Sequence, residues 1–339
     1  MKAVGFYRNL PIDDAESLVD VDVAKPAPAV RELLVEVKAI SVNPVDYKVR
    51  MRPDPNAQLP RILGWDAAGV VREVGSAVQL FKPGDEVYYA GAMQKPGANS
   101  EYHVVDERIV GHKPRKLGFA AAAALPLTTL TAWEGMFDRL GISSSGADRG
   151  KSVLLIGGAG GVGSIAIQLA KKLAGLHVIA TASRPESSKW VRELGADTVI
   201  DHAGDLAAQL QAAGVAAADY VFCLTDATPY FPRFASIIRP QGKLCLIVSM
   251  SEPVQLTALM QKNVSIHWEF MFTRSLFQTP DMQRQHEILE EAARLIDSGT
   301  LHTTVGQSLG SINAANLRRA HQMLERGRTI GKIVLEGFT

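Results

Sequence analysis

Residues 154–171 read LLIGGAGGVGSIAIQLAK, a short apolar run that ends in glycines and passes at once into a helical pattern. The glycines have the spacing G-x-G-x-x-G in the strand–turn–helix setting that gives this motif its meaning. Such glycines let the backbone turn tightly and approach a pyrophosphate closely, while the helix start offers N–H groups to an anion. The stretch therefore predicts a dinucleotide-binding turn formed by Gly158, Ala159, Gly160, Gly161, Val162 and Gly163.

The pattern around this turn changes twice along the chain. The first 125 or so residues read mainly as strands separated by turn signals, which predicts a compact β-rich domain. From about residue 151, short apolar runs alternate with helical stretches, which predicts a doubly wound parallel (Rossmann) sheet and an α/β class. After about residue 266 we expect two amphipathic helices, near 281–298 and 312–327, and a final strand that returns to the first domain. The expected domains are 1–127 with 268–339, and 128–267.

Composition excludes several classes of protein. At 339 residues the chain fits two domains, and 47% hydrophobic and 21% charged residues are typical of a globular protein with a large core. The net charge of +1 gives no indication of a nucleic-acid or membrane partner, and we find neither a signal-type start nor a long apolar run. Cys223 and Cys245 lie in apolar strand-like runs, so we expect buried thiols and a cytoplasmic protein.

The residues after the second strand of the Rossmann pattern bear on the choice of nucleotide. An acidic residue about 20 positions beyond the glycines usually binds the ribose 2′-hydroxyl of NAD. Here HVIATA leads instead into Ser183 and Arg184. A guanidinium suits a 2′-phosphate because its planar fork makes charge-assisted hydrogen bonds, so we predict NADP(H). Two alternatives stay open: Glu186 could reverse the preference, and Arg184 could be an ordinary solvated charge.

Seven motifs follow one another along the chain: SVNPVDYKVR, LGWDAAGVV, FKPGDEV, AAALPLTTLTAW, IGGAGGVGS, ELGAD and GKIVL. Together they resemble the medium-chain dehydrogenase/reductase superfamily, in particular its quinone-oxidoreductase-like branch, over essentially the whole chain. The resemblance implies a GroES-like catalytic domain interrupted by a Rossmann domain, with the cofactor in the cleft between them. It also implies a homodimer.

The resemblance bears on zinc as well. Zinc-dependent members have a cysteine ligand where this chain has Asn43, a histidine ligand at Trp65 and a third ligand, usually cysteine, near residues 126–127. A glutamate follows their histidine, where this chain has Asp66. The cysteines of their structural zinc lobe are absent too. Because catalytic zinc needs about three N, S or O ligands, we predict that no metal binds. Asp46 and Asp66 survive as acids, but two carboxylates alone are a poor zinc site, and surface or hydrogen-bonding roles explain them adequately.

Without a Lewis acid, oxidation of simple alcohols loses several kcal/mol of transition-state stabilisation. Hydride addition to an alkene conjugated with a carbonyl needs less, because charge spreads onto an enolate oxygen that hydrogen-bond donors can stabilise. We therefore predict NADPH-dependent, zinc-free reduction of quinones, enones or related small electrophilic alkenes. The alternatives are a metal-dependent alcohol dehydrogenase that uses the two aspartates, and a non-catalytic nucleotide-binding protein. The sequence does not identify the physiological substrate.

The predicted catalytic residues are Asn43, Tyr47 and Lys48. Asn43 replaces a zinc ligand, and in quinone-reductase relatives this asparagine lies by the nicotinamide; the alternative is a turn-capping residue before Pro44. Relatives often carry a tyrosine two residues after the motif's aspartate, where this chain has Lys48. Tyr47 comes one residue early, so solvent could replace it as proton donor. Lys48 could stabilise an oxyanion or be a surface lysine.

The resemblance adds three cofactor contacts outside the glycine turn. Thr131 matches a threonine that contacts the nicotinamide, His202 stands where relatives have a tyrosine near the adenosine, and Ser249 lines the nicotinamide pocket. A helix-start hydroxyl and an ordinary loop histidine are the alternatives for Thr131 and His202. The aromatic stretch 268–277, WEFMFTRSLF, is typical of a core or dimer interface and could also line a substrate pocket.

Overall fold

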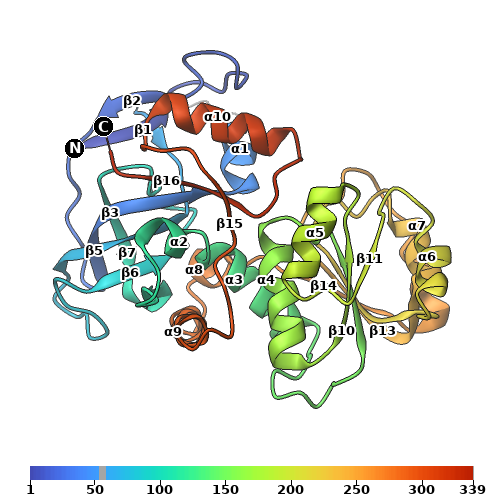
Figure 1. Cartoon of the computed structure of the whole chain (residues 1–339). Helices are drawn as coiled ribbons and strands as arrows, with labels where there is room; N and C mark the ends of the chain where they lie inside the picture. The colour runs from blue at the N-terminus through green and yellow to red at the C-terminus, as the bar shows by residue number, and fades with distance from the viewer. Residues whose placement is uncertain (53–58, 339) are drawn as a thin grey trace. The chain divides into compact units, whose positions relative to one another are not determined.

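A computed structural model describes residues 1–52 and 59–338 of the chain (Figure 1). The chain divides into two compact units, Met1–Leu127 with Phe272–Thr339, and Thr128–Met271. The sequence-based boundary at 267/268 falls within strand β14 (Ser265–Trp268), the last strand of the second unit. No helix among the described residues is long and apolar enough to cross a membrane.

The first unit is built on a seven-stranded sheet in which the end of the chain pairs with its beginning. Strand β16 runs antiparallel to β3, with Ile333 opposite Val42, so the tail returns to this unit. The path of the sheet is β15 (Val305–Ser308), β16 (Lys332–Glu336), β3 (Glu32–Val42), β5 (Asp66–Val74), β6 (Glu86–Tyr89) and β8 (Val110–His112), with β7 (Tyr102–Asp106) on β3. A smaller sheet consists of β2 (Val19–Asp22), β1 (Lys2–Phe6) and β4 (Arg61–Ile62).

Among the residues that the structure describes, five α-helices lie in the first unit, and the two expected near the C-terminus are confirmed. Each is a few residues shorter than its apolar pattern; the second begins after the N-cap Asn313, whose side chain accepts from Asn316 N at 2.9 Å. The five are α1 (Pro44–Arg50), α2 (Phe119–Ala123), α8 (Thr273–Phe277), α9 (Arg284–Asp297) and α10 (Ala314–Glu325).

The second unit confirms the predicted doubly wound sheet. Its six parallel strands are, in spatial order, β11 (Thr198–Ile200), β10 (His177–Thr181), β9 (Ser152–Ile156), β12 (Ala218–Cys223), β13 (Ile238–Leu246) and β14. Figure 1 shows helices on both sides of the sheet, as expected when right-handed crossovers run in both directions from a central strand. They are α4 (Gly161–Leu169) with α5 (Pro185–Glu193), and α6 (Leu206–Ala212) with α7 (Phe231–Ile237). Helix α3 (Pro126–Trp133) crosses the boundary between the units.

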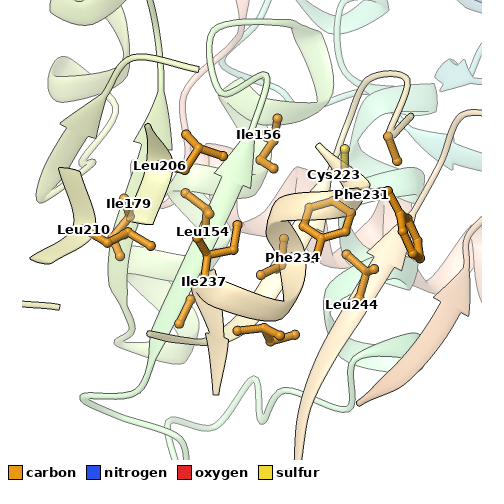
Figure 2. Close-up of a cluster of buried hydrophobic side chains, with 14 of the residues drawn as sticks. Leu154, Ile156, Ile179, Leu206, Leu210, Cys223, Phe231, Phe234, Ile237 and Leu244 are labelled. Carbon is orange, nitrogen blue, oxygen red and sulfur yellow. The ribbon is translucent and has the colours of Figure 1, made fainter. Parts of the chain in front are cut away.

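The core of the second unit holds β9 rigidly. All five residues of β9 are buried, as expected for a central parallel strand with both faces covered. Leu154 and Ile156 belong to a buried cluster that includes Leu206 and Phe231 from the helices on one face (Figure 2). The glycine turn therefore projects from the end of a strand that has little freedom to move.

Both cysteines are buried and free, as the sequence predicts. Burial raises the pKa of the Cys223 thiol to about 12 and that of Cys245 well above its usual value. Because the thiolate is the reactive form, neither side chain is suited to nucleophilic chemistry or metal binding.

His321 on α10 makes the first unit sensitive to acid. Its ring is fully buried with both nitrogens unpartnered among the described residues. Burial, together with the charge of Arg50, lowers the pKa of His321 to about 3. The unfolded chain takes up a proton near pH 6.5 while the folded chain stays neutral, so stability is complete above this pH and is lost as pH falls from about 6.5 toward 3.

We therefore expect His321→Leu to reduce the acid sensitivity of the protein. At about pH 5 the wild-type loses roughly 2 kcal/mol of unfolding free energy through this group, and the variant does not. Urea denaturation of both proteins at about pH 7 and about pH 5 measures the difference. Other buried groups such as His103 are common to both proteins and cancel. An identical pH dependence of the two unfolding free energies would contradict the assignment.

Candidate functional site

The predicted dinucleotide turn lies between β9 and α4, at the carboxyl edge of the parallel sheet. Gly157 has a φ of +88°, and its N–H donates to Thr181 Oγ1 at 2.9 Å. Gly158 N donates to Thr181 O at 3.2 Å, which fixes the turn to the end of β10. Helix α4 begins after Gly160, and the bond from Ser164 N to Gly160 O measures 2.9 Å. The backbone N–H groups that precede Ser164 in the first turn have no acceptor within the helix, as at any helix start.

The three motif glycines have different environments. A Cβ at Gly163 would lie 2.4 Å from Gly158 O, and one at Gly158 would lie 2.8 Å from the Ala180 Cβ. Both positions are needed for close packing of helix on strand. A Cβ at Gly160 would have only Gly157 O within 4 Å, at 3.6 Å, and would otherwise project into open space. That open space beside a helix start fits a pyrophosphate.

The remaining residues of the turn are partly exposed, and side-chain hydrogen bonds hold the start of α4 in place. Ala159, Gly161 and Val162 are partly exposed. Ser164 Oγ donates to Gly160 O at 2.8 Å and accepts from Trp190 Nε1 at 2.8 Å, which connects the start of α4 to α5. The N–H groups at the turn are thus held in place before any ligand binds.

The predicted 2′-phosphate residues lie at the carboxyl end of β10. Ser183 is exposed, and Arg184 is half-buried as the N-cap residue of α5. Ser187 Oγ accepts from Arg184 N at 3.1 Å and donates to Arg184 O at 2.9 Å, so the loop has a fixed backbone. Glu186 is exposed on the first turn of the same helix.

Two further predicted cofactor residues follow strands of the same sheet. His202, partly exposed, comes after β11, and Ser249, exposed, comes after β13. The carboxyl ends of parallel strands share one edge, and the strand order reverses between β9 and β12, where ligands of such sheets bind. Thr131 is buried in α3.

A pocket of about 540 Å³ lies in the second unit, between the segment after β13 and the end of β14. It is lined by Ser249, Met250, Ser251, Glu252, Pro253 and Trp268. The Trp268 side chain is half exposed. The lining thus combines an indole ring, a thioether, two hydroxyl groups and the Glu252 carboxylate.

Asn43, the first predicted catalytic donor, is buried in the first unit and fully engaged. Its Nδ2 donates to Asp66 Oδ2 at 2.8 Å and to Ser41 O at 3.5 Å, and its Oδ1 accepts from Lys332 Nζ. Its backbone N–H donates to Asp46 Oδ2 at 2.6 Å, which caps α1. Both amide hydrogens are thus directed at protein acceptors, and the role of Asn43 as a donor to a substrate stays a prediction.

Tyr47 and Lys48 both lie on α1. Tyr47 is half-buried, and burial together with the nearby Glu325 raises the pKa of its phenol. A tyrosine with a raised pKa keeps its proton at neutral pH and can donate it. Lys48 is exposed.

The residues at the zinc-related positions do not fit a zinc ion. Asn43 offers an engaged amide, Trp65 an indole that cannot ligate, and Asp66 a carboxylate that already accepts from Lys332 Nζ at 2.9 Å. An ammonium group here repels a divalent cation. Across residues 1–52 and 59–338, no group of three or more His, Cys, Asp or Glu side chains could hold a metal. Asp46 and Asp66 are buried and accept hydrogen bonds, so of the two predicted roles the hydrogen-bonding role is the one observed and the surface role is not.

Lys332 is the site residue that the sequence-based prediction omits. It belongs to the motif GKIVL, which the sequence alone identifies only as a strand. One feature of the sequence could have identified it: Lys332 begins a strongly apolar strand. A lysine in such a strand is rarely buried unless an acidic or polar group pairs with it.

Comparisons with known proteins identify the family of both units. The alcohol dehydrogenase GroES-like domain matches residues 29–134, and the zinc-binding dehydrogenase family matches residues 194–335. A zinc-type alcohol dehydrogenase-like protein of Staphylococcus aureus is 42% identical over 336 residues, which cover 99% of each chain. The 2-methylene-furan-3-one reductase of Solanum lycopersicum is 31% identical over 325 residues, 94% of this chain and 74% of the relative.

A solved structure extends the likeness to the whole fold. The Escherichia coli quinone oxidoreductase complexed with NADPH is 27% identical, with a TM-score of 0.83 over 99% of this chain and 100% of the other. The inserted parallel sheet, the glycine turn and these matches lead to one conclusion. The chain belongs to the medium-chain dehydrogenase/reductase superfamily, whose members are oxidoreductases.

Proposed function

We propose that the protein is an NADPH-dependent reductase of quinones, enones or related electrophilic alkenes and works without zinc. The observation that carries this proposal is the Lys332 ammonium, which pairs with Asp66 and donates to Asn43, the residue that stands where zinc-dependent members carry a cysteine ligand. Without a Lewis acid, the chemistry favoured is hydride addition to a conjugated system, whose negative charge is delocalised. The names of the tomato and Escherichia coli relatives, an enone-type reductase and a quinone oxidoreductase, support the same substrate class.

Bound NADPH would supply the hydride. The turn from Gly158 to Gly163 would bind its pyrophosphate, and Ser183 and Arg184 its 2′-phosphate. The adenosine would lie near His202, and the nicotinamide near Thr131 and Ser249. On the catalytic side, Asn43 would orient the start of α1, while the protonated Tyr47 and Lys48 on the same helix would donate to a developing enolate.

We also propose a cytoplasmic homodimer. Strand β14 ends the parallel sheet, and Trp268 and Phe270 beside it are 50% and 45% exposed. A sheet edge flanked by exposed aromatic side chains is a favourable surface for pairing with a second copy. The two free, buried thiols suit a reducing compartment.

The direct test of the function follows the hydride. Purified protein is incubated with cyclohexenone or an ortho-quinone and NADPH deuterated at C4, with each C4 epimer used in turn. We expect NADPH oxidation equal to product formed, and one deuterium on the β-carbon of the reduced enone for one epimer only. Tight NADPH binding without turnover on any quinone or enone would instead indicate a non-catalytic nucleotide-binding protein.

Arg184→Ala tests the nucleotide preference. Loss of charge-assisted bonds to the 2′-phosphate is expected to weaken NADPH binding by roughly 10- to 100-fold, while NADH binding stays nearly the same. Calorimetric titration of each nucleotide measures both constants. Arg192→Ala, an exposed arginine on the same helix, is the matched control and should change neither. Equal losses for NADPH and NADH in Arg184→Ala would remove this residue from the 2′-phosphate site.

A further inference from the structure

The Lys332 side chain is only 3% exposed, and its ammonium lies among oxygen atoms from separate parts of the first unit. Nζ donates to Val42 O at 3.1 Å, to Asp66 Oδ2 at 2.9 Å and to Asn43 Oδ1. These oxygens come from the end of β3, the start of β5 and the N-cap of α1. The ammonium thus has all three of its hydrogens directed at acceptors.

Its partners extend the arrangement to the starts of two helices. Asp66 Oδ1 accepts from Leu127 N at 2.7 Å, at the beginning of α3. Asp66 Oδ2 also accepts from Asn43 Nδ2, and Asn43 in turn caps α1, which carries Tyr47 and Lys48. The Lys332 ammonium is therefore linked to the start of α3 through Asp66 and to the start of α1 through Asn43.

Removal of this cation would deprive three groups of one partner each. Val42 O and Asn43 Oδ1 would each lose a donor, and the fully buried Asp66 would lose its counter-charge. Uncompensated groups of this kind are costly inside a protein, so the local backbone would have to rearrange or admit water or another cation. Asn43 and the first turn of α1 would lose their fixed orientation.

We propose that Lys332 is a built-in cation that does in this protein the structural work of a bound metal, holding Asn43, Asp66 and the start of α1 in their active arrangement. It is a positioning residue. The expected effect on kcat rests on the proposed function, whereas the expected effect on Tm does not. Truncation to alanine should leave a space lined by oxygen atoms that a small alkylammonium ion can enter.

The test is chemical rescue of Lys332→Ala. We expect the variant to lose about 10 °C in Tm and about 100-fold in kcat for enone or quinone reduction. NADPH affinity should be retained, because the predicted nucleotide residues lie in the second unit. Methyl-, ethyl- and propylammonium chloride should raise both Tm and kcat in a saturable way. Tetramethylammonium and sodium chloride at equal ionic strength should not.

Two further variants serve as controls for the rescue experiment. Lys332→Met retains the length of the side chain without its charge, so it should be impaired and should not respond to alkylammonium ions. Lys82→Ala removes an exposed lysine and should match the wild-type protein throughout. Wild-type Tm and kcat in Lys332→Met would overturn the inference, as would rescue of Tm without kcat. If the wild-type protein reduces no quinone or enone, the proposed function fails, yet the response of Tm still tests Lys332.

Discussion

Gly163→Ala is expected to lower the free energy of unfolding of the second unit by about 3 kcal/mol or more. The new Cβ would lie 2.4 Å from Gly158 O, 2.6 Å from Gly158 C and 2.7 Å from Gly157 O. All three are backbone atoms at the end of a buried central strand, so no flexible side chain can move aside. The gain in helix propensity from glycine to alanine, about 1 kcal/mol, is too small to offset this clash. Chemical denaturation followed by tryptophan fluorescence or circular dichroism measures the loss.

Gly160→Ala is the matched comparison in the same turn. Its Cβ would meet only Gly157 O at 3.6 Å, an ordinary contact, so stability should change by no more than about 0.5 kcal/mol. The same methyl group projects into the space assigned to the pyrophosphate and should weaken NADPH binding at least about tenfold, roughly 1.4 kcal/mol. A stable variant with wild-type affinity for NADPH would show that the nucleotide does not approach this turn.

Asp66→Leu is expected to destabilise the first unit by about 3–5 kcal/mol. Asp66 is completely buried, and its loss would leave the Lys332 ammonium without a counter-charge and remove an acceptor from both Leu127 N and Asn43 Nδ2. Glu73→Ala, on the same strand, breaks the exposed pair with Lys25 and should cost at most about 1 kcal/mol. Urea unfolding of the three proteins gives the comparison.

A double-mutant cycle separates the ion pair from simple loss of packing. Most of the stability lost in each single variant comes from a buried charge left without its partner. The double variant Asp66→Leu/Lys332→Met should therefore lose less unfolding free energy than the two single variants added together, by about 2 kcal/mol or more. Additive single effects would mean that the two side chains do not interact in solution, and the proposed role of Lys332 would lose its basis.

The features predicted correctly from sequence depend on local patterns. The glycine spacing, the apolar run before it and the helical period after it all lie within 154–171, and β9, the turn and α4 follow from them. The amphipathic helices α9 and α10 have the same basis. Strand β14 escaped prediction because it is a four-residue edge strand with no fully buried residue, which leaves little periodic signal.

The environment of Asn43 could not be predicted because it depends on a contact between the two ends of the first unit. Lys332 is 289 positions away in sequence and reaches Asn43 only because β16 pairs with β3. The local sequence SVNPVD indicates a cap before Pro44, and GKIVL indicates a strand. Neither indicates that an ammonium group and an amide share a buried carboxylate.

The most direct test of zinc-free NADPH-dependent reduction is turnover by protein treated with EDTA and shown to be metal-free by elemental analysis. NADPH oxidation is followed with an ortho-quinone, an enone and a simple aldehyde, before and after chelation. The account predicts reduction of the quinone or enone at a rate that chelation does not change. Activity confined to the aldehyde, abolished by EDTA and restored by zinc, would contradict it.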